Sequence, residues 1–544
     1  MGDIQNQSSR ARIAMKVSAS IQRIGLIQPI VQVGKSLRIQ KSPTGIQCIS
    51  AYLKRNGLET RMFHAEESPE LLEDILDYSP DLVGFSAFTV NFPAAQSIAQ
   101  KLRNRLKETP FVLGGWHASG VAESYLRGYE EWSLREVLSP ESPFDFIVIG
   151  EGEEPIVRLI GSLNEGKNKG AVELSSVQGI GYLDENNHVV LNRGTRVAKL
   201  DDLPDPDWDG LDINTYRDQR NTSRIDLSVH AQRGCRFRCT FCQTPSLYES
   251  SVKRMSPERV VNYVESLITR FNPTDLTFTD EDFLSSPQWV KELCLLIIER
   301  GLNKVCYGSF GSLNDIIRFE KLGVLELLAK AGWQNYFVGI ESLNSHTLNV
   351  YDRPISQKEK DVIQEYLKKI QAAIEVSRER NLLLFGDYII GYFEESETDL
   401  EVGCKLLKSL RNMLYVYLPI FTPFPGTPVW QIAVKKDLLG KTDGKVDWSQ
   451  YDCSHQVTNL PFDAMELRDA FEREYFTSEN YVNDMLEHIG KSPEFLKNWY
   501  LPLFNKLKRD HNGTSVFDHV IDRLCALGEP VSVQRPESDL VSHF

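Results

Sequence analysis

Three cysteines on one short segment have the clearest chemical potential in this sequence. In GCRFRCTFC, Cys235, Cys239 and Cys242 follow a C-x3-C-x2-C spacing, directly after an apolar run, RIDLSVHA, that is typical of a buried strand. Thiolates are soft metal ligands, and a 4Fe-4S cluster held entirely by protein takes four of them. A compact set of three therefore predicts a cluster in which one iron is left open to a small-molecule ligand.

A structural zinc site is the alternative for these cysteines. It would need a fourth ligand from elsewhere in the chain, such as His230 or the distant Cys306. The other cysteines stand singly, and we interpret them as small core residues: Cys48, Cys294, Cys306, Cys404, Cys453 and Cys525. Nine cysteines are an odd number in a long chain, which favours thiol or metal chemistry over a disulfide framework.

The cysteine motif, including Phe241 directly before the third cysteine, resembles the signature of the radical S-adenosylmethionine (SAM) superfamily. The resemblance implies that the open iron binds the amino and carboxylate groups of SAM, with Phe241 beside the cofactor. One electron, supplied by an external donor such as flavodoxin or ferredoxin, then cleaves SAM to methionine and a 5'-deoxyadenosyl radical. The resemblance names no further catalytic residue.

Four carboxylates fall where this superfamily contacts SAM. Asp280, Glu281 and Asp282 in TFTDEDF stand in place of the usual Gly-Gly-Glu, so the pattern leaves open which one accepts from the methionine ammonium. Glu341 in VGIES resembles the ribose-contacting segment. The alternatives are a solvated acidic turn for the first three and a capping carboxylate for Glu341.

Apolar runs alternate with helix-like stretches ahead of the cysteines. The runs IGLIQPI, TRMFHA, DLVGFSAF, FVLGG and FDFIVIG are continuous, as in parallel strands covered on both faces by helices. We therefore expect an α/β chain with a polar tail at 1–20 and a Rossmann-like domain at 21–170. A hairpin, GIGYLDENNHVVLN, and a linker, DDLPDPDWDG, make up 171–222.

Six further β/α units predict an open, partial (β/α)6 barrel at 223–431. Its strands are RIDLSVHA, TDLTFTD, KVCYGSF, QNYFVGI, LLLFGDYII and LYVYLPIF, and ligands are expected at their carboxyl ends. Gly391 and Gly426 follow the last two strands, where a glycine lets the backbone approach a ligand or simply permits a turn.

Residues 432–544 predict a helical C-terminal domain that caps the barrel mouth. Its aromatic residues either line a substrate pocket or pack in the core: Trp448, Tyr451, Tyr475 and Tyr481.

The order of a Rossmann-like domain, an LPDPDWD linker and a radical barrel resembles the cobalamin-binding radical SAM subfamily over residues 22–430. The Asp-x-His-x-x-Gly motif is absent, since His64 has no matching glycine, which implies cobalamin bound without a protein histidine ligand. A vestigial domain without cobalamin, and a purely structural His117, are the alternatives. Strand-end positions are the candidate cobalamin contacts: Ser86, Thr89, Gly114, Gly115, His117, Gly150 and Glu151.

Composition narrows the expected partners and location. A net charge of -14 argues against nucleic acid, which is bound by clustered Lys and Arg. No run of 18 apolar residues and no secretory signal in the first 20 residues are visible, so we expect a cytoplasmic chain without a membrane partner.

The subfamily resemblance favours a methyltransferase that acts on an unactivated carbon, or phosphorus, of a small molecule or peptide, with two molecules of SAM used per methyl. A rearrangement, cyclisation or oxidation with the same cofactors is the second hypothesis. The third is a non-catalytic iron-sulfur or corrinoid protein that senses redox state.

Overall fold

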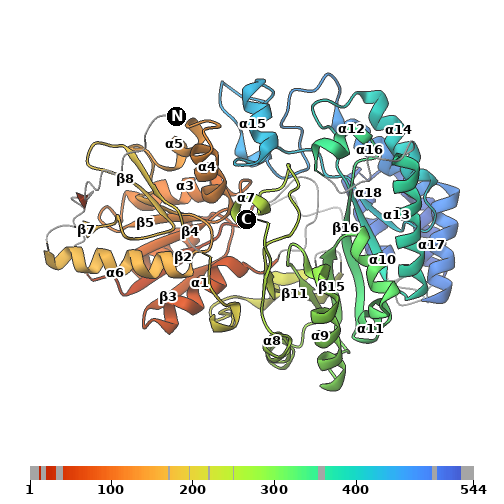
Figure 1. Cartoon of the computed structure of the whole chain (residues 1–544), viewed down its shortest axis with the longest axis horizontal. Helices are drawn as coiled ribbons and strands as arrows, with labels where there is room; N and C mark the ends of the chain where they lie inside the picture. Colours follow the sequence, from red (N-terminus) through yellow and green to blue (C-terminus); the bar gives the residue numbers. More distant parts are fainter. Residues whose placement is uncertain are drawn as a thin grey trace, which may run out of the picture.

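The computed structural model describes residues 12–13, 20–31, 41–169, 172–194, 196–218, 221–248, 250–352, 362–492, 499–511 and 513–527. The expected polar tail at 1–20 therefore lies almost entirely outside the described residues. Two α/β bodies lie side by side, each built on its own seven-stranded sheet (Figure 1). The expected α/β architecture is confirmed.

The first sheet has the strand order β3-β2-β4-β5-β6-β8-β9, and its first five members run parallel. Strands β8 and β9 form the expected hairpin, and β8 pairs antiparallel with β6, so the sheet continues past residue 170. The strands are β2 (Arg23–Ile27), β3 (Glu59–Phe63), β4 (Leu82–Ser86), β5 (Phe111–Gly114), β6 (Phe146–Val148), β8 (Ile180–Leu183) and β9 (Val189–Asn192).

Helices cover both faces of this sheet, because alternate strand residues feed two separate cores. Leu82 packs in the core beneath α1 and α6, whereas its neighbour Val83 packs in the core beneath α2 to α5. This two-sided burial explains the continuous apolar runs in the sequence. The helices are α1 (Thr44–Arg55), α2 (Pro69–Tyr78), α3 (Phe92–Arg103), α4 (Trp116–Leu126), α5 (Trp132–Val137) and α6 (Glu153–Lys169).

The second sheet has the order β10-β11-β14-β15-β16-β17-β18, and β11 to β18 are parallel neighbours. Among the described residues its two edges do not pair, so it is the open barrel that the sequence predicts. The strands are β10 (Arg217–Asp218), β11 (Asn221–Val229), β14 (Asp275–Phe278), β15 (Cys306–Gly311), β16 (Trp333–Glu341), β17 (Leu383–Tyr388) and β18 (Tyr415–Tyr417).

The barrel helices begin where capping residues predict them. Ser256 and Ser286 each accept a hydrogen bond from the third helical backbone N–H, and each is followed by a proline at the first helical position. The helices on the outside of this sheet are α8 (Pro257–Phe271), α9 (Pro287–Glu299), α10 (Leu313–Lys321), α11 (Val324–Lys330), α13 (Val362–Glu379) and α14 (Glu397–Ser409).

From Tyr475 onward, the C-terminal helices lie at the amino end of the last barrel strand and not at the barrel mouth. The hydroxyls of Tyr475 and Tyr481 donate to the carbonyls of Met413 and Leu414, immediately before β18 begins. The expectation that residues 432–544 cap the mouth is corrected for the part from Tyr475 onward, whereas Ala464, at the start of α16, lies beside Gly391 just past the carboxyl end of β17. The helices are α16 (Ala464–Thr477), α17 (Glu479–Lys491), α18 (Leu501–Asp510) and α19 (Asp518–Cys525).

A separate segment joins the two bodies near the mouth. It contains α15 (Pro428–Lys435), which lies between them in Figure 1, and Trp448 and Tyr451. Trp430, Trp448 and Tyr451 are buried in the core of the first body. These aromatic residues pack as core and line neither of the two cavities described below. Among the described helices, none is long and apolar enough to cross a membrane.

Candidate functional site

The three cysteines lie on the loop between β11 and α7 (Thr244–Tyr248), at the carboxyl end of the first barrel strand. The Cys242 backbone N–H donates to the Cys239 carbonyl at 3.1 Å, which folds the loop into a turn. Burial raises the pKa of Cys242 to about 11 and that of Cys235 further, and the neighbouring thiols add to both shifts. The three thiols thus share one site, and metal binding would displace their protons.

Three thiols on one short loop are the ligand set of a 4Fe-4S cluster with one open iron. Among the described residues, no three His, Cys, Asp or Glu side chains are grouped closely enough to hold one metal ion. A 4Fe-4S cluster is larger than one ion and is held at separate irons, so its thiolates need not meet at a common point. Cys239 is buried and the other two cysteines are partly exposed, which leaves the site accessible to SAM.

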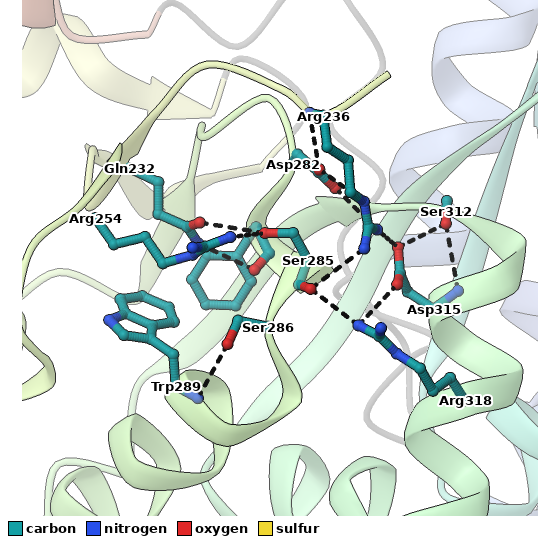
Figure 2. A network of polar contacts seen from close by, with 11 residues as sticks. Gln232, Arg236, Arg254, Asp282, Ser285, Ser286, Trp289, Ser312, Asp315 and Arg318 are labelled. Atoms are coloured by element: carbon teal, nitrogen blue, oxygen red, sulfur yellow. Dashed lines mark hydrogen bonds and ion pairs between the residues drawn. The ribbon is translucent and has the colours of Figure 1, made fainter. Parts of the chain in front are cut away.

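A network of polar contacts anchors the cysteine loop to the barrel (Figure 2). The Arg236 guanidinium pairs with Asp282 at 3.1 Å and with Asp315, and it donates to the Ser285 carbonyl at 3.2 Å. Arg318 reaches the same carbonyl and the same Asp315 carboxylate. Both carboxylates are buried, so the loop is fixed by charge-assisted contacts on its outer side.

The three consecutive carboxylates predicted to contact SAM face different surroundings. Asp280 is fully buried and accepts from the backbone N–H groups of Ala231 and Gln232, at 2.8 and 2.5 Å. Burial raises the pKa of Asp282 to about 6, although the Arg236 guanidinium opposes that shift. Glu281 alone among the three lines the large cavity described next, and it accepts from the Gly234 N–H at 3.2 Å.

Glu341 ends β16 with a backbone φ of 67°, in the left-handed region that side chains other than glycine rarely adopt. It is 8% exposed, and its charge adds to burial in raising the pKa of Asp387 on the neighbouring strand. Backbone strain of this kind clusters at functional sites, where the surrounding structure maintains it. Glu341 does not line the cavity between the two bodies, so the acceptor role predicted for it stays a prediction.

Phe241 packs in an apolar cluster beside the cysteine loop. Its ring meets the Tyr351 ring edge-on at 4.7 Å, and both belong to a small apolar cluster beside the cysteines. The position predicted to lie beside SAM thus also holds the cysteine loop against the barrel.

A cavity of about 990 Å³ separates the two bodies at the carboxyl ends of both sheets. The first body contributes five of the predicted cobalamin positions to its wall: Ser86, Gly114, Gly115, Gly150 and Glu151. The barrel contributes Ser228, His230, Arg233, Thr279 and Glu281. Ligand pockets span roughly 300–1,000 Å³, so this cavity is large enough for a bulky cofactor.

Thr89 and His117 do not line this cavity, so their position does not support the contacts predicted for them. His117 is fully buried, stacks on Phe92 at 4.1 Å, and lies 3.4 Å from the Thr89 hydroxyl. Burial lowers its pKa to about 3, which keeps the imidazole neutral. His117 Nε2 has no hydrogen-bond partner among the described residues, and the cobalamin contacts expected of His117 and Thr89 stay predictions.

The cavity wall is suited to a polar ligand. The buried atoms Ser42 Oγ, Ser228 Oγ and His230 Nε2 have no hydrogen-bond partner among the described residues. Leaving such groups unpaired costs about 1–3 kcal/mol each, so a ligand that bonds to them gains affinity. Gly115, at φ 92°, brings the backbone so close that a Cβ there would lie 2.7 Å from the Ala87 carbonyl oxygen.

Sequence reasoning missed most of the barrel side of this wall. His230 was considered only as a zinc ligand, and burial lowers its pKa to about 4, so it presents a neutral imidazole. Arg233 pairs with Glu153 at 2.5 Å and lies 3.7 Å from Glu151, which ties the cysteine loop to the first body. Their position after the first barrel strand was the available signal, because ligand contacts gather at strand ends.

Comparisons with known protein families identify two domains, which correspond to the two α/β bodies. Residues 229–406 match the family model of the radical SAM superfamily, and residues 33–160 match that of the B12 binding domain. The solved structure of OxsB, a cobalamin-dependent SAM radical enzyme, superposes with a TM-score of 0.61 at 17% identity, over 93% of this chain and 80% of that one. The radical SAM methyltransferase TsrM of Kitasatospora setae gives 0.60 at 15% identity, over 93% and 100%.

Curated relatives are more similar in sequence. An uncharacterised methyltransferase of Pyrococcus horikoshii is 25% identical over 77% of this chain and 84% of its own length. The anaerobic magnesium-protoporphyrin IX monomethyl ester cyclase of Cereibacter sphaeroides is 26% identical over 66% and 54%. The hopanoid C-3 methylase of Methylococcus capsulatus is 23% identical over 80% and 75%.

The matched domains, the fold and the cavity between the two bodies define a radical SAM enzyme with a B12-binding domain. The chain belongs to the cobalamin-dependent radical SAM enzymes, as its sequence predicts. The cofactors of such an enzyme are a 4Fe-4S cluster, SAM and cobalamin.

Proposed function

We propose that this enzyme methylates an unactivated carbon, or phosphorus, of a small molecule or peptide. The observation that carries the proposal is the cavity of about 990 Å³, whose wall joins the B12-binding body to Glu281 beside the cysteine loop. A methyl donor and a radical source would then face each other across one space. Relatives named as methyltransferases support this reaction class.

In this proposal Cys235, Cys239 and Cys242 hold the cluster, while Glu281 accepts from the SAM ammonium and Glu341 from its ribose. The glycine-lined strand ends of the first body, with Ser86 and Glu151, hold cobalamin. The cofactors together supply a radical that abstracts hydrogen and a methyl group for transfer. The chain's own residues bind and orient them.

The electron donor, the cellular location and the absence of a nucleic-acid partner stay predictions. Reduction of the cluster requires an external one-electron donor, of which flavodoxin and ferredoxin are the expected types. The lack of a nucleic-acid partner is predicted from the net charge of -14, and the cytoplasmic location is predicted from the sequence's apolar pattern.

A cyclisation with the same cofactors is the second candidate. It is favoured by three relatives named as anaerobic magnesium-protoporphyrin IX monomethyl ester cyclases, at 23–26% identity. Product mass separates the two reactions, because methylation adds one CH2 to the substrate whereas oxidative ring closure removes hydrogen.

The test is anaerobic reconstitution with iron, sulfide and cobalamin, followed by iron and cobalt counts. The triple variant Cys235→Ala/Cys239→Ala/Cys242→Ala should lose the cluster and keep cobalamin, since the thiols and the first body are separate. Cys404→Ala, a single cysteine on α14, is the matched control and should keep both. A wild-type protein that retains no cobalamin would contradict methyl transfer, and one without a cluster would contradict the radical chemistry.

A further inference from the structure

A second cavity, of about 320 Å³, lies inside the barrel itself. We call it the lumen chamber. Strand register places its wall in layers, with Asp226, Asp275 and Cys306 side by side in the lowest layer. Phe310, Phe337, Phe385 and Tyr415 form the highest layer, nearest the carboxyl ends of the strands. The chamber therefore lies beneath the residues proposed to hold SAM.

The C-terminal region supplies the floor of the lumen chamber. Trp499, Tyr500 and Leu503 line it from the segment that leads into α18. The Trp499 ring meets Phe385 edge-on at 5.2 Å, and the Arg224 guanidinium lies 4.7 Å from its ring centre. The segment that leads into α18 is therefore part of the chamber wall and shapes the space inside the barrel.

The charges in the chamber wall cancel in pairs. Arg224 donates to Asp275 through two nitrogens, one at 2.9 Å, and Lys41 lies 2.5 Å from Asp226. Thr277 donates to the same Asp226 carboxylate at 2.8 Å. A buried ionic ligand needs a charge partner, and these charges already neutralise one another. The wall therefore favours a ligand without net charge.

Much of the rest of the wall is aromatic, and Asn335 on β16 adds a side-chain amide. Phe310 and Phe337 stack at 5.2 Å, and Phe337 meets Phe385 edge-on at 4.9 Å, which leaves ring faces and edges along one side. Asn335 is 8% exposed, and its side-chain amide makes no hydrogen bond within the described part of the chain. An amide in an apolar chamber offers a directional contact to a polar group on a ligand.

The lumen chamber adjoins the large cavity, because Lys41 and Thr279 line both. We propose that the chamber holds the substrate, and that this substrate is a neutral, mainly apolar molecule with an aromatic ring and a hydroxyl or similar group that hydrogen-bonds Asn335. The inference rests on the proposed function for the use of the chamber, but the binding it predicts needs neither cobalamin nor SAM cleavage.

Equilibrium dialysis of 2-naphthol against the reconstituted holoenzyme tests the proposal. Leu383→Trp places a large side chain at a chamber position that is 3% exposed, and should weaken 2-naphthol binding at least 10-fold. Leu295→Trp, on the outer face of α9 and 48% exposed, is the matched control and should bind as the wild type does. Iron counts and melting temperature establish that both variants fold.

A second variant tests the polar contact without filling the chamber. Asn335→Leu should weaken 2-naphthol binding roughly 5-fold, as loss of one hydrogen bond predicts, and should leave 2-methoxynaphthalene, which lacks the hydroxyl donor, less affected. The anion 2-naphthoate should bind the wild type at least 10-fold more weakly than 2-naphthol.

The outcomes separate this inference from the proposed function. Equal binding of 2-naphthol by wild type and Leu383→Trp, or tighter binding of 2-naphthoate, would overturn the lumen chamber as a site for neutral aromatic molecules. A wild type that binds 2-naphthol in the predicted way but transfers no methyl group would contradict the proposed reaction and leave the chamber assignment standing.

Discussion

At the scale of single residues, Asp280, Glu281 and Asp282 are adjacent in the chain yet meet three different environments. Asp280 accepts hydrogen bonds from backbone N–H groups, Asp282 forms an ion pair with Arg236, and Glu281 lines the cavity. Their order in the sequence predicted a carboxylate near SAM but not which one, because side-chain direction after a strand depends on the backbone path of the turn.

Glu281→Gln removes a negative charge from the cavity wall while keeping the shape of the side chain. If Glu281 accepts from the SAM ammonium, SAM should bind about 10–100-fold more weakly, since a hydrogen bond to a charged group contributes about 1.5–3 kcal/mol. Calorimetry on the anaerobically reconstituted protein measures this. Glu299→Gln, an exposed residue on α9, is the control. Unchanged affinity in Glu281→Gln would assign the contact elsewhere.

Arg236→Gln leaves Asp282 and Asp315 without their shared cation, although Arg318 still reaches Asp315. Removing the cation leaves two buried carboxylates with less charge compensation, so the loop should loosen and the cluster should be lost faster. The rate of iron release to a chelator checks this. Arg238→Gln, on the same loop, makes none of the contacts in Figure 2 and should release iron at the wild-type rate. Equal rates in both variants would show that the network does not fix the loop.

At the scale of helices and strands, the sequence predicted each element that local signals specify. Continuous apolar runs became the parallel strands, and α8 and α9 each begin at a serine followed by proline, a pair that signals a helix start in any sequence. The pairing of β8 with β6 could not be predicted, because an alternating apolar pattern indicates a strand but not which sheet edge the strand joins. Likewise, Tyr475 and Tyr481 bond to backbone about 60 residues earlier in the chain, and no local pattern signals that contact.

Glu395 links the loops that follow two neighbouring barrel strands. It is 5% exposed, and it accepts from Thr347 at 2.9 Å, Ser342 at 3.2 Å and the Tyr392 N–H at 3.2 Å. Burial nevertheless raises its pKa from an ordinary value of 4.5 to about 7. The folded protein therefore binds this proton more tightly than the unfolded chain does.

The stabilisation from this proton is complete below about pH 4.5 and is lost as the pH rises through 7, an effect of about 1–3 kcal/mol. Glu395→Gln cannot titrate, so its melting temperature relative to the wild type should rise between pH 5.5 and pH 8. Differential scanning calorimetry at both values measures this. Exposed Glu397→Gln is the control and should show the same difference at both pH values. A flat profile for Glu395→Gln would contradict the assigned cause.

At the scale of the whole molecule, the site exists only because the two bodies meet closely. Helix α4 of the first body lies against the cysteine loop and the loop after β18, with Gly120 at the contact. A Cβ on Gly120 would lie 2.3 Å from Gln243 Nε2 and 2.7 Å from the Pro425 carbonyl oxygen. Gly426, at φ 83°, approaches the Gly120 carbonyl equally closely, so its predicted approach to a ligand is an approach between the two bodies.

Gly120→Ala should therefore push the bodies apart at the cavity. Overpacking of this kind costs about 1–3 kcal/mol, and it should also weaken cobalamin retention, because the cavity wall is shared between the bodies. Gly161→Ala, on α6 with no atom within 4 Å of the added carbon, should instead gain about 0.5–1 kcal/mol from helix propensity and keep cobalamin. Melting temperature and cobalt content after desalting compare the two. If Gly120→Ala instead melts at a higher temperature, as Gly161→Ala should, the two bodies can move apart at this contact without loss of stability. The Arg233 ion pairs with Glu151 and Glu153 would then be the contacts that fix the width of the cavity.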